Sequence, residues 1–190
     1  MRVIAGEWRG RRLTAPRGSE TRPSTARLRE AMFSALGTVV RGATVVDLFA
    51  GSGALGIESL SRGARHVTFV ERHGRAVQAI ESNLQSLDVP RDAARVLRSD
   101  ARVWLDRLDA GRQRDGGLVL ADPPYGDESL ATLLPRAAAW VQSGALDVFV
   151  LEYPSSLLPG AVEGIDDEGL RVRTRRHGRG AFTIVERSVG

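Results

Sequence analysis

Strand-like and helix-like patterns alternate along most of this chain, and this alternation constrains its fold more than any other feature. Short runs rich in Val, Leu and Phe alternate with segments whose apolar residues recur every three to four positions. The strand-like runs span 44–49, 66–71, 95–100, 117–122 and 147–153, and the helical segments between them span 54–62, 75–87, 101–108 and 129–141. Such alternation predicts an α/β protein with a mostly parallel sheet and helices on both faces.

The start of the chain predicts an arm and one further helix. Residues 1–22 contain two short strand-like pieces around the glycines of GEWRG, which predicts a short β-hairpin arm. A helix is expected over 21–37, where Ser24 or Thr25 can cap its first turn and Gly37 ends it.

The end of the chain predicts a closing hairpin. Residues 170–187 hold two strand-like runs that are joined through Gly178 and Gly180. We therefore expect two parts, a basic arm over 1–22 and a single domain over 23–190.

Positive charge is concentrated at the two ends of the chain. All 27 basic residues are arginines, and the formal net charge is +4. Residues 1–30 hold eight arginines and three glutamates, residues 169–190 hold six arginines and one glutamate, and residues 31–168 hold 13 arginines and 19 acidic residues. Arginine suits bidentate contacts with phosphate, so two basic ends favour a polyanionic partner. A solvated surface and a GC-rich coding bias are the alternative explanations.

The composition also excludes several classes of site. There is no cysteine, so disulfides and thiolate metal sites are excluded, and the three histidines are scattered, so no metal site is expected. No apolar run has the length of a signal peptide core or a membrane span. We therefore expect a cytoplasmic protein with no membrane contact.

A glycine-rich loop follows the first predicted strand. Gly51, Gly53 and Gly56 have the GxGxxG spacing between a strand and a helix, and Glu71 ends the next strand. In dinucleotide sites, such glycines admit a pyrophosphate to the helix N-terminus and the acid binds the ribose. The spacing alone does not distinguish NAD from other adenosine ligands.

Acidic residues stand at the carboxyl ends of four predicted strands, the edge where open α/β sheets bind ligands. Asp47 directly precedes the glycine loop, where it would repel a pyrophosphate and attract the ammonium and sulfonium groups of S-adenosyl-L-methionine. Glu71 would then bind the ribose hydroxyls and Asp100 the adenine amine. Simple helix capping is the alternative for Glu71 and Asp100.

The segment DPPY ends the fourth predicted strand. The carboxylate of Asp122 and the carbonyl of Pro123 can accept the two N–H groups of an exocyclic amine, which favours a tetrahedral nitrogen with an available lone pair. Pro123 and Pro124 would hold the backbone rigid, and Tyr125 would stack on an extruded base. Methyl transfer would then depend mainly on positioning. A strand-ending turn is the alternative for this segment taken alone.

In this order, DLFAGSGALGIE, VER, SDA and DPPY resemble the motifs of class I S-adenosylmethionine-dependent methyltransferases. The resemblance covers about residues 40–190 and implies a Rossmann-like, seven-stranded sheet whose last strand is antiparallel. It implies S-adenosyl-L-methionine as cofactor, no metal, and catalytic roles for Asp122, Pro123, Pro124 and Tyr125. The cofactor-binding residues that it implies are Asp47, Phe49, Ala50, Gly51, Ser52, Gly53, Glu71, Arg72, Asp100 and Ala101.

The N-terminal third is more specific. MRVIAGEWRGRRL and TRPSTARLREAMFSAL resemble the start of the RsmD-like bacterial small-subunit ribosomal RNA guanine-N2 methyltransferases, and HGRGAFTIVER resembles their last hairpin. This resemblance implies a monomer that methylates a guanine of small-subunit ribosomal RNA in a partly assembled subunit. Six arginines are candidate phosphate contacts, namely Arg9, Arg11, Arg12, Arg22, Arg27 and Arg29.

Three other functions fit parts of the sequence. An adenine-N6 methyltransferase acting on RNA or DNA would use DPPY equally well. An RNA-binding assembly factor would use the same fold as a platform. An NAD(P)-binding oxidoreductase fits the glycine spacing, but Asp47 and DPPY argue against it.

Overall fold

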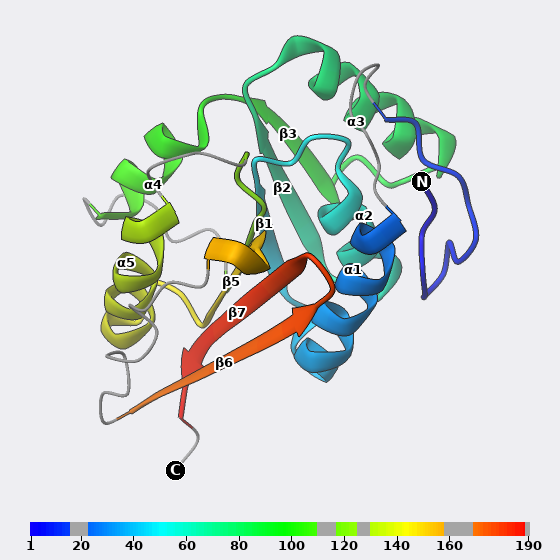
Figure 1. The fold of residues 1–190 in the computed structure, drawn as a ribbon. Helices are drawn as coiled ribbons and strands as arrows, with labels where there is room; N and C mark the ends of the chain where they lie inside the picture. The colour runs from blue at the N-terminus through cyan, green and yellow to red at the C-terminus, as the bar shows by residue number, and fades with distance from the viewer. Residues whose placement is uncertain (16–22, 110–116, 125–129, 158–168, 189–190) are drawn as a thin grey trace.

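The computed structural model describes residues 1–15, 23–109, 117–124, 130–157 and 169–188, and these form one seven-stranded sheet with helices on both faces (Figure 1). The strands are β1 (Thr44–Leu48), β2 (His66–Glu71), β3 (Ala94–Arg98), β4 (Leu118–Ala121), β5 (Val148–Pro154), β6 (Leu170–His177) and β7 (Gly180–Arg187). Their order across the sheet is β3-β2-β1-β4-β5-β7-β6. β7 is antiparallel to both of its neighbours, and β1 to β5 are mutually parallel. The predicted fold class is confirmed.

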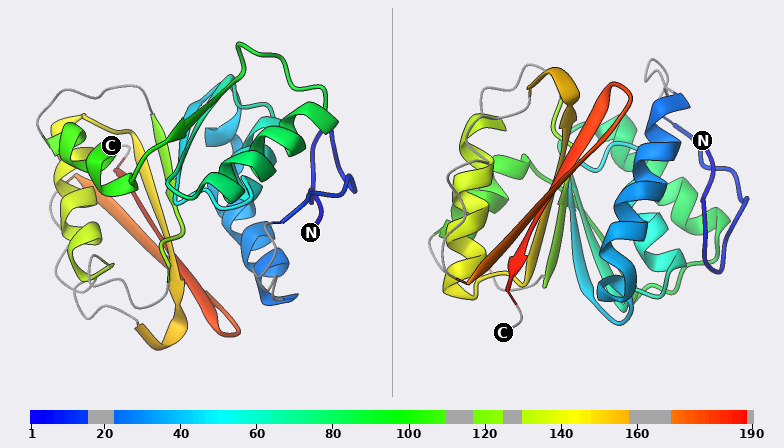
Figure 2. Two further views of the ribbon diagram at one scale, coloured as in Figure 1. Left: turned by 90° about the horizontal axis from the view of Figure 1, so that it is seen from above. Right: turned by 60° about the horizontal axis from the view of Figure 1, so that its bottom comes forward.

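Helices cover the two faces of the sheet unequally. They are α1 (Pro23–Leu36), α2 (Ala54–Ser61), α3 (Gly74–Ser86), α4 (Ala101–Asp109) and α5 (Leu130–Ser143), with short 3-10 helices η1 (Gly37–Val40) and η2 (Ser155–Leu157). α1, α2 and α3 pack on one face, and α4 and α5 pack on the other (Figure 2). Because both faces of the central strands are covered, β4 is buried along its whole length, as expected for a parallel strand.

The first helix lies within the range 21–37 that the sequence pattern predicts. α1 starts at Pro23, a residue that suits the first helical position because its fixed φ is already helical. Ser24 and Thr25 follow Pro23 in the first turn, and the side chains on which their predicted capping role depends lie outside what the structure describes. The predicted end is confirmed, since α1 stops at Leu36 and Gly37 takes a φ of +57°.

The N-terminal arm packs against the helical layer. Arg2 and Arg12 form an antiparallel bridge, and the side chains of Val3 and Leu13 are buried in the core. The buried carboxylate of Glu58 in α2 accepts the backbone N–H groups of two arm residues, Ile4 and Ala5, at 2.8 and 3.0 Å. The arm is thus tied to the domain by burial and by hydrogen bonds.

Candidate functional site

A pocket of about 200 Å³ opens at the carboxyl ends of the parallel strands. It is lined by Phe49, Val70, Glu71, Arg72, His73, Asp100, Ala101, Arg102, Asp122 and Pro124. Seven of these were expected from the sequence, whereas Val70, His73 and Arg102 were not. Each of the three lies within two residues of an acid that the sequence did single out, so the motifs located the pocket but not all of its wall. The carboxyl edge of the sheet, where a ligand site was expected, therefore carries a pocket.

Glu71 fixes the glycine loop to the end of β2. Its two carboxylate oxygens accept the backbone N–H groups of Gly51 at 2.9 Å and His73 at 2.8 Å. Gly51 itself has a φ of +55°, which glycine adopts without steric cost. Because the N–H of Gly51 already bonds to a carboxylate, this loop is unsuited to cradle a pyrophosphate. The loop suits a ligand without phosphates.

Phe49 stands in a strained conformation where β1 meets this loop. Its φ is +58°, a value that is rare for residues other than glycine. Such strain is held only where surrounding structure enforces it, and it occurs often at ligand sites. Phe49 lines the pocket, so its conformation is part of the pocket wall.

Asp47 lies beneath the loop and outside the lining of the described pocket. It is 1% exposed, and its carboxylate accepts the backbone N–H of Gly56 in the first turn of α2 at 2.9 Å. Burial raises the pKa of Asp47, the bond from Gly56 opposes that shift, and the neighbouring carboxylates of Asp122 and Glu71 reinforce it. Asp47 therefore anchors the loop, and its expected contact with a ligand ammonium group stays a prediction.

Three more of the expected cofactor contacts belong to the glycine loop itself. Ala50 and Ser52 are buried, and the carbonyl of Ser52 accepts a hydrogen bond from the side chain of Asn83 at 3.0 Å. Gly53 has a φ of +78° and precedes the first residue of α2. These residues shape the loop behind the pocket, and direct contact with a cofactor stays a prediction for each of them.

Asp100 at the start of α4 is held by two arginines. It accepts the backbone N–H and the guanidinium of Arg102, both at 2.9 Å, and lies 3.6 Å from the guanidinium of Arg72. The side-chain hydrogen bond from Arg102 is the main reason why the pKa of Asp100 falls to about 2. The capping role considered for this residue is therefore present. Ala101 follows Asp100 on the pocket wall and adds an apolar surface beside it.

Asp122 reaches the pocket from the end of β4. Its side chain is open to solvent through the pocket mouth, while the protein around and beneath it removes much of its hydration. This desolvation raises the pKa of Asp122 to about 6. Of the other residues of the segment, Pro123 is buried, Pro124 lines the pocket, and Tyr125 lies outside the described residues.

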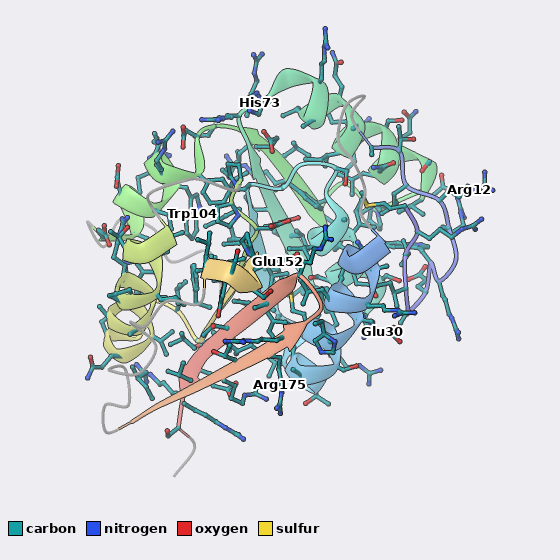
Figure 3. The ribbon with its side chains drawn as sticks, viewed as in Figure 1. Arg12, Glu30, His73, Trp104, Glu152 and Arg175 are labelled. Atoms are coloured by element: carbon teal, nitrogen blue, oxygen red, sulfur yellow. The ribbon has the colours of Figure 1, made fainter. Side chains whose placement is uncertain are left out.

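Glu152 is a second carboxylate at this edge, and sequence reasoning missed it. The pairing of Ala121 with Leu151 places the following residues, Asp122 and Glu152, beside each other at the ends of β4 and β5. Glu152 is 6% exposed, and burial together with the charge of Asp122 raises its pKa, while Arg29 opposes the shift. In Figure 3 it lies near the centre of the molecule. An acid close to the end of the fifth predicted strand was the available signal.

The candidate RNA contacts fall into three groups. Arg9, Arg11, Arg12 and Arg27 are exposed, and Figure 3 shows Arg12 at the periphery of the arm. Arg22 lies outside the described residues.

Arg29 does not belong with the exposed group. It is 5% exposed, and its guanidinium donates to the carbonyl of Arg2 at 2.8 Å and lies 3.9 Å from the carboxylate of Glu58. The expectation that Arg29 contacts phosphate is therefore wrong, because the apolar face of α1 carries it into the interior.

The comparisons with known proteins agree with this geometry. A family model described as "Conserved hypothetical protein 95" matches residues 1–183. The chain belongs to this family. The chain is 43% identical to the Bacillus subtilis protein named "Putative rRNA methyltransferase YlbH" over 136 residues, which are 70% of this chain and 72% of that protein.

A named Escherichia coli protein and a solved Escherichia coli structure extend the comparison. The chain is 40% identical over 125 residues to "Ribosomal RNA small subunit methyltransferase D", covering 66% of this chain and 60% of that enzyme. The solved structure named "Putative methyltransferase yhhF from Escherichia coli" matches with a TM-score of 0.76 and 31% identity, covering 100% of this chain and 99% of that one. These relatives are named as methyltransferases, so the chain belongs to a family that includes methyltransferases.

The described residues lack two further features, a membrane-spanning helix and a metal-binding cluster. Among the described residues, no helix is both long enough and apolar enough to cross a membrane. Within the same ranges, no group of three or more His, Cys, Asp and Glu side chains is placed to hold a metal ion.

Proposed function

We propose that this protein transfers a methyl group from S-adenosyl-L-methionine to the exocyclic N2 amine of a guanine in small-subunit ribosomal RNA. The observation that carries the proposal is the position of Asp122. Asp122 directly follows β4 and lines a pocket whose other acids and apolar residues suit a cationic adenosine ligand. The names of the relatives supply the class of RNA.

The cofactor fits the donor groups that the pocket presents. Glu71 and Asp100 offer carboxylate oxygens, and Ala101 and Val70 offer an apolar wall, a combination that suits ribose hydroxyls beside an adenine ring. When bound, the cofactor supplies an electrophilic methyl carbon on a sulfonium sulfur. Arg72 and the glycine-loop residues complete the proposed cofactor site.

Asp122 and Pro123 act on the acceptor amine. The carboxylate of Asp122 and the backbone carbonyl of Pro123 accept its N–H groups and turn the nitrogen lone pair toward the methyl carbon. Bonding of the nitrogen to the methyl carbon, as the carbon–sulfur bond breaks, would put a positive charge on the nitrogen, and Asp122 would receive the proton that the nitrogen then loses. Holding the two reactants in line supplies much of the rate.

Glu152 favours guanine over adenine. Guanine carries the N1–H group beside its N2 amine, so two neighbouring carboxylates match two neighbouring donors. Adenine presents an N1 acceptor beside its amine, and a carboxylate at that point would be left unpaired. The pairing of β4 with β5 sets Asp122 beside Glu152, which is buried outside the described lining of the pocket, and this proximity supports the proposal.

The wider setting is part of the same proposal. Arginine-rich surfaces contact the RNA phosphates, the protein acts as a monomer without a metal, and it works in the cytoplasm on partly assembled small subunits. The net charge of +4 and the exposed arginines support a ribonucleoprotein substrate.

The test is methyl transfer from labelled S-adenosylmethionine to immature small subunits, protein-free small-subunit ribosomal RNA and duplex DNA. We expect N2-methylguanosine in RNA, identified by mass spectrometry, and none in DNA. Detection of N6-methyladenine on any substrate would show that the target base is adenine and that the proposed guanine is wrong. Undiminished transfer by Asp122→Ala would show that the acceptor mechanism is wrong.

A further inference from the structure

Exposed arginines gather at the turn between β6 and β7. Arg175, Arg176 and Arg179 are exposed, and none of them forms an ion pair with any residue that the structure describes. The carboxylate of Glu186 on β7 does not compensate them, because it pairs with arginines nearer the start of β6 at 3.0 and 3.8 Å. The turn therefore retains its positive charge.

This turn lies at the same edge of the sheet as the pocket. β5 and β6 are both antiparallel to β7, so they run in the same direction and their carboxyl ends share one edge. The turn is also fixed to the end of β5. Ser155 donates its backbone N–H to the carbonyl of Arg179 at 2.8 Å and its hydroxyl to the carbonyl of Gly178 at 3.2 Å. The charged turn is thus anchored three residues beyond Glu152.

The turn also rests against α1. A Cβ added to Gly180 would lie 2.5 Å from a side-chain carbon of Leu28, so the backbone of the turn lies directly on this helix. Arg27 precedes Leu28 and is exposed. Figure 3 shows Arg175 on the part of β6 that lies beside α1. Arg27 therefore adds positive charge on α1 next to the residue that the turn contacts, and we group it with the three arginines of the turn.

The tip of the arm lies at the opposite edge. The N–H of Glu7 bonds to the carbonyl of Ser61, and Arg11 bonds to the carbonyl of Ser86. Ser61 and Ser86 are the last residues of α2 and α3. Both helices start at the carboxyl edge of the sheet and return to the amino edge, as crossover helices between parallel strands do. Arg9 and Arg11 are therefore remote from Asp122.

We infer that Arg27, Arg175, Arg176 and Arg179 form the surface on which the substrate RNA docks, holding the phosphates on either side of the target base at the mouth of the pocket. This inference rests on the proposed function and adds the location of the RNA. Phosphate contacts of this kind fix the position of a strand without reading its sequence. Recognition then falls to the pocket, which takes the unstacked base.

The test compares two triple variants that remove equal charge. The first is Arg175→Gln/Arg176→Gln/Arg179→Gln. The matched control is Arg41→Gln/Arg91→Gln/Arg95→Gln, three exposed arginines near the starts of β1 and β3, at the amino edge. Filter binding of protein-free small-subunit ribosomal RNA over a range of salt gives the affinity and its salt dependence.

We expect the turn variant to lose at least tenfold in RNA affinity at low salt. The slope of log K against log salt should fall by about 2, since each single-strand phosphate contact contributes roughly 0.7. The control should change affinity less than twofold. Equal losses in the two variants, or an unchanged turn variant, would overturn the inference.

Methyl transfer separates this inference from the proposed function. With a wild-type protein that methylates small subunits, the turn variant should show a raised KM for RNA, a kcat within about twofold of wild type, and unchanged S-adenosylmethionine binding by calorimetry. A wild type that methylates no RNA would refute the proposed function, while the binding comparison would still decide where RNA docks. A wild type that binds no RNA would overturn the docking surface.

Discussion

Asp122 is a titrating group whose ionised form is the one that can receive the proton of the amine. Its pKa is raised to about 6, so below that pH one of its oxygens is already protonated and the carboxyl group can no longer take up that proton. We expect kcat/KM to fall about tenfold per pH unit below pH 6 and to level off above it. Because Asp122 and Glu152 interact, the observed value belongs to the pair.

Asp122→Asn is the control for this pH dependence. The amide keeps an acceptor oxygen but does not titrate, so the acid limb should disappear while the rate falls by about 10² to 10⁴-fold. An unchanged acid limb would assign the titration to another group.

The raised pKa of Asp122 also predicts how the stability of the folded protein changes with pH. Between about pH 4 and pH 6 the folded protein holds a proton on Asp122 that the unfolded chain has lost, so the free energy of unfolding falls as the pH rises. Asp122→Asn removes this loss, so the variant should be more stable than wild type at neutral pH.

Glu152 is predicted to recognise the N1–H group of guanine. The test substrate carries 2-aminopurine at the target position, because this base has the amine but no N1–H. Wild type should prefer guanine by about tenfold to a hundredfold, the ratio that leaving one buried polar group unpaired produces. Glu152→Ala should bring that ratio close to one, and exposed Glu30→Gln should leave it unchanged. An undiminished ratio in Glu152→Ala would restrict Glu152 to a structural role.

At the scale of elements, the junction of α2 with the sheet depends on one glycine. A Cβ added to Gly56 would lie 2.3 Å from Cε1 of Phe69 and 2.8 Å from Cγ1 of Val67, and both of those side chains are fully buried. Gly56→Ala should therefore force α2 away from the sheet and lower the free energy of unfolding by about 1–3 kcal/mol. Urea denaturation measures the loss.

Gly74→Ala is the matched control at the start of α3. Its added Cβ would meet Arg98 at an ordinary contact distance of 3.5 Å, and its φ is not in the left-handed region. Alanine is the better helix former, so this variant should be neutral or more stable by up to about 1 kcal/mol. If Gly56→Ala behaved in the same way, close packing at that glycine would not limit the position of α2.

At the scale of the whole molecule, the arm is predicted to contribute to stability. Deleting residues 1–13 would remove two N–H donors from the buried carboxylate of Glu58 and expose the apolar surface that Val3 and Leu13 cover. We expect a loss on the order of 3 kcal/mol, seen as a lower midpoint of thermal unfolding. Arg9→Gln/Arg12→Gln, which alters exposed charges only, should leave the midpoint unchanged. An unchanged midpoint after the deletion would make the arm a separable extension, as its composition suggested.

The order of the elements, the parallel sheet and the glycine loop with its neighbouring acids could all be predicted from the sequence alone. These follow from local periodicity and from a geometric rule, because parallel strands bring their carboxyl ends to one edge wherever each strand lies in the sheet. That is why Glu71, Asp100 and Asp122 could be expected at one pocket before their neighbours were known.

The contacts between residues of different helices and strands could be seen only in the tertiary structure. Glu152 lies beside Asp122 because β5 pairs with β4. Arg29 is interior because α1 turns it toward Glu58 and the arm. Likewise, the basic turn after β6 lies at the edge of the sheet that carries the pocket because β7 lies between β5 and β6 in the sheet and is antiparallel to both. Strand order and helix orientation depend on contacts between residues far apart in the chain. Local pattern does not encode those contacts, so the position of each arginine relative to the pocket emerged only with the fold.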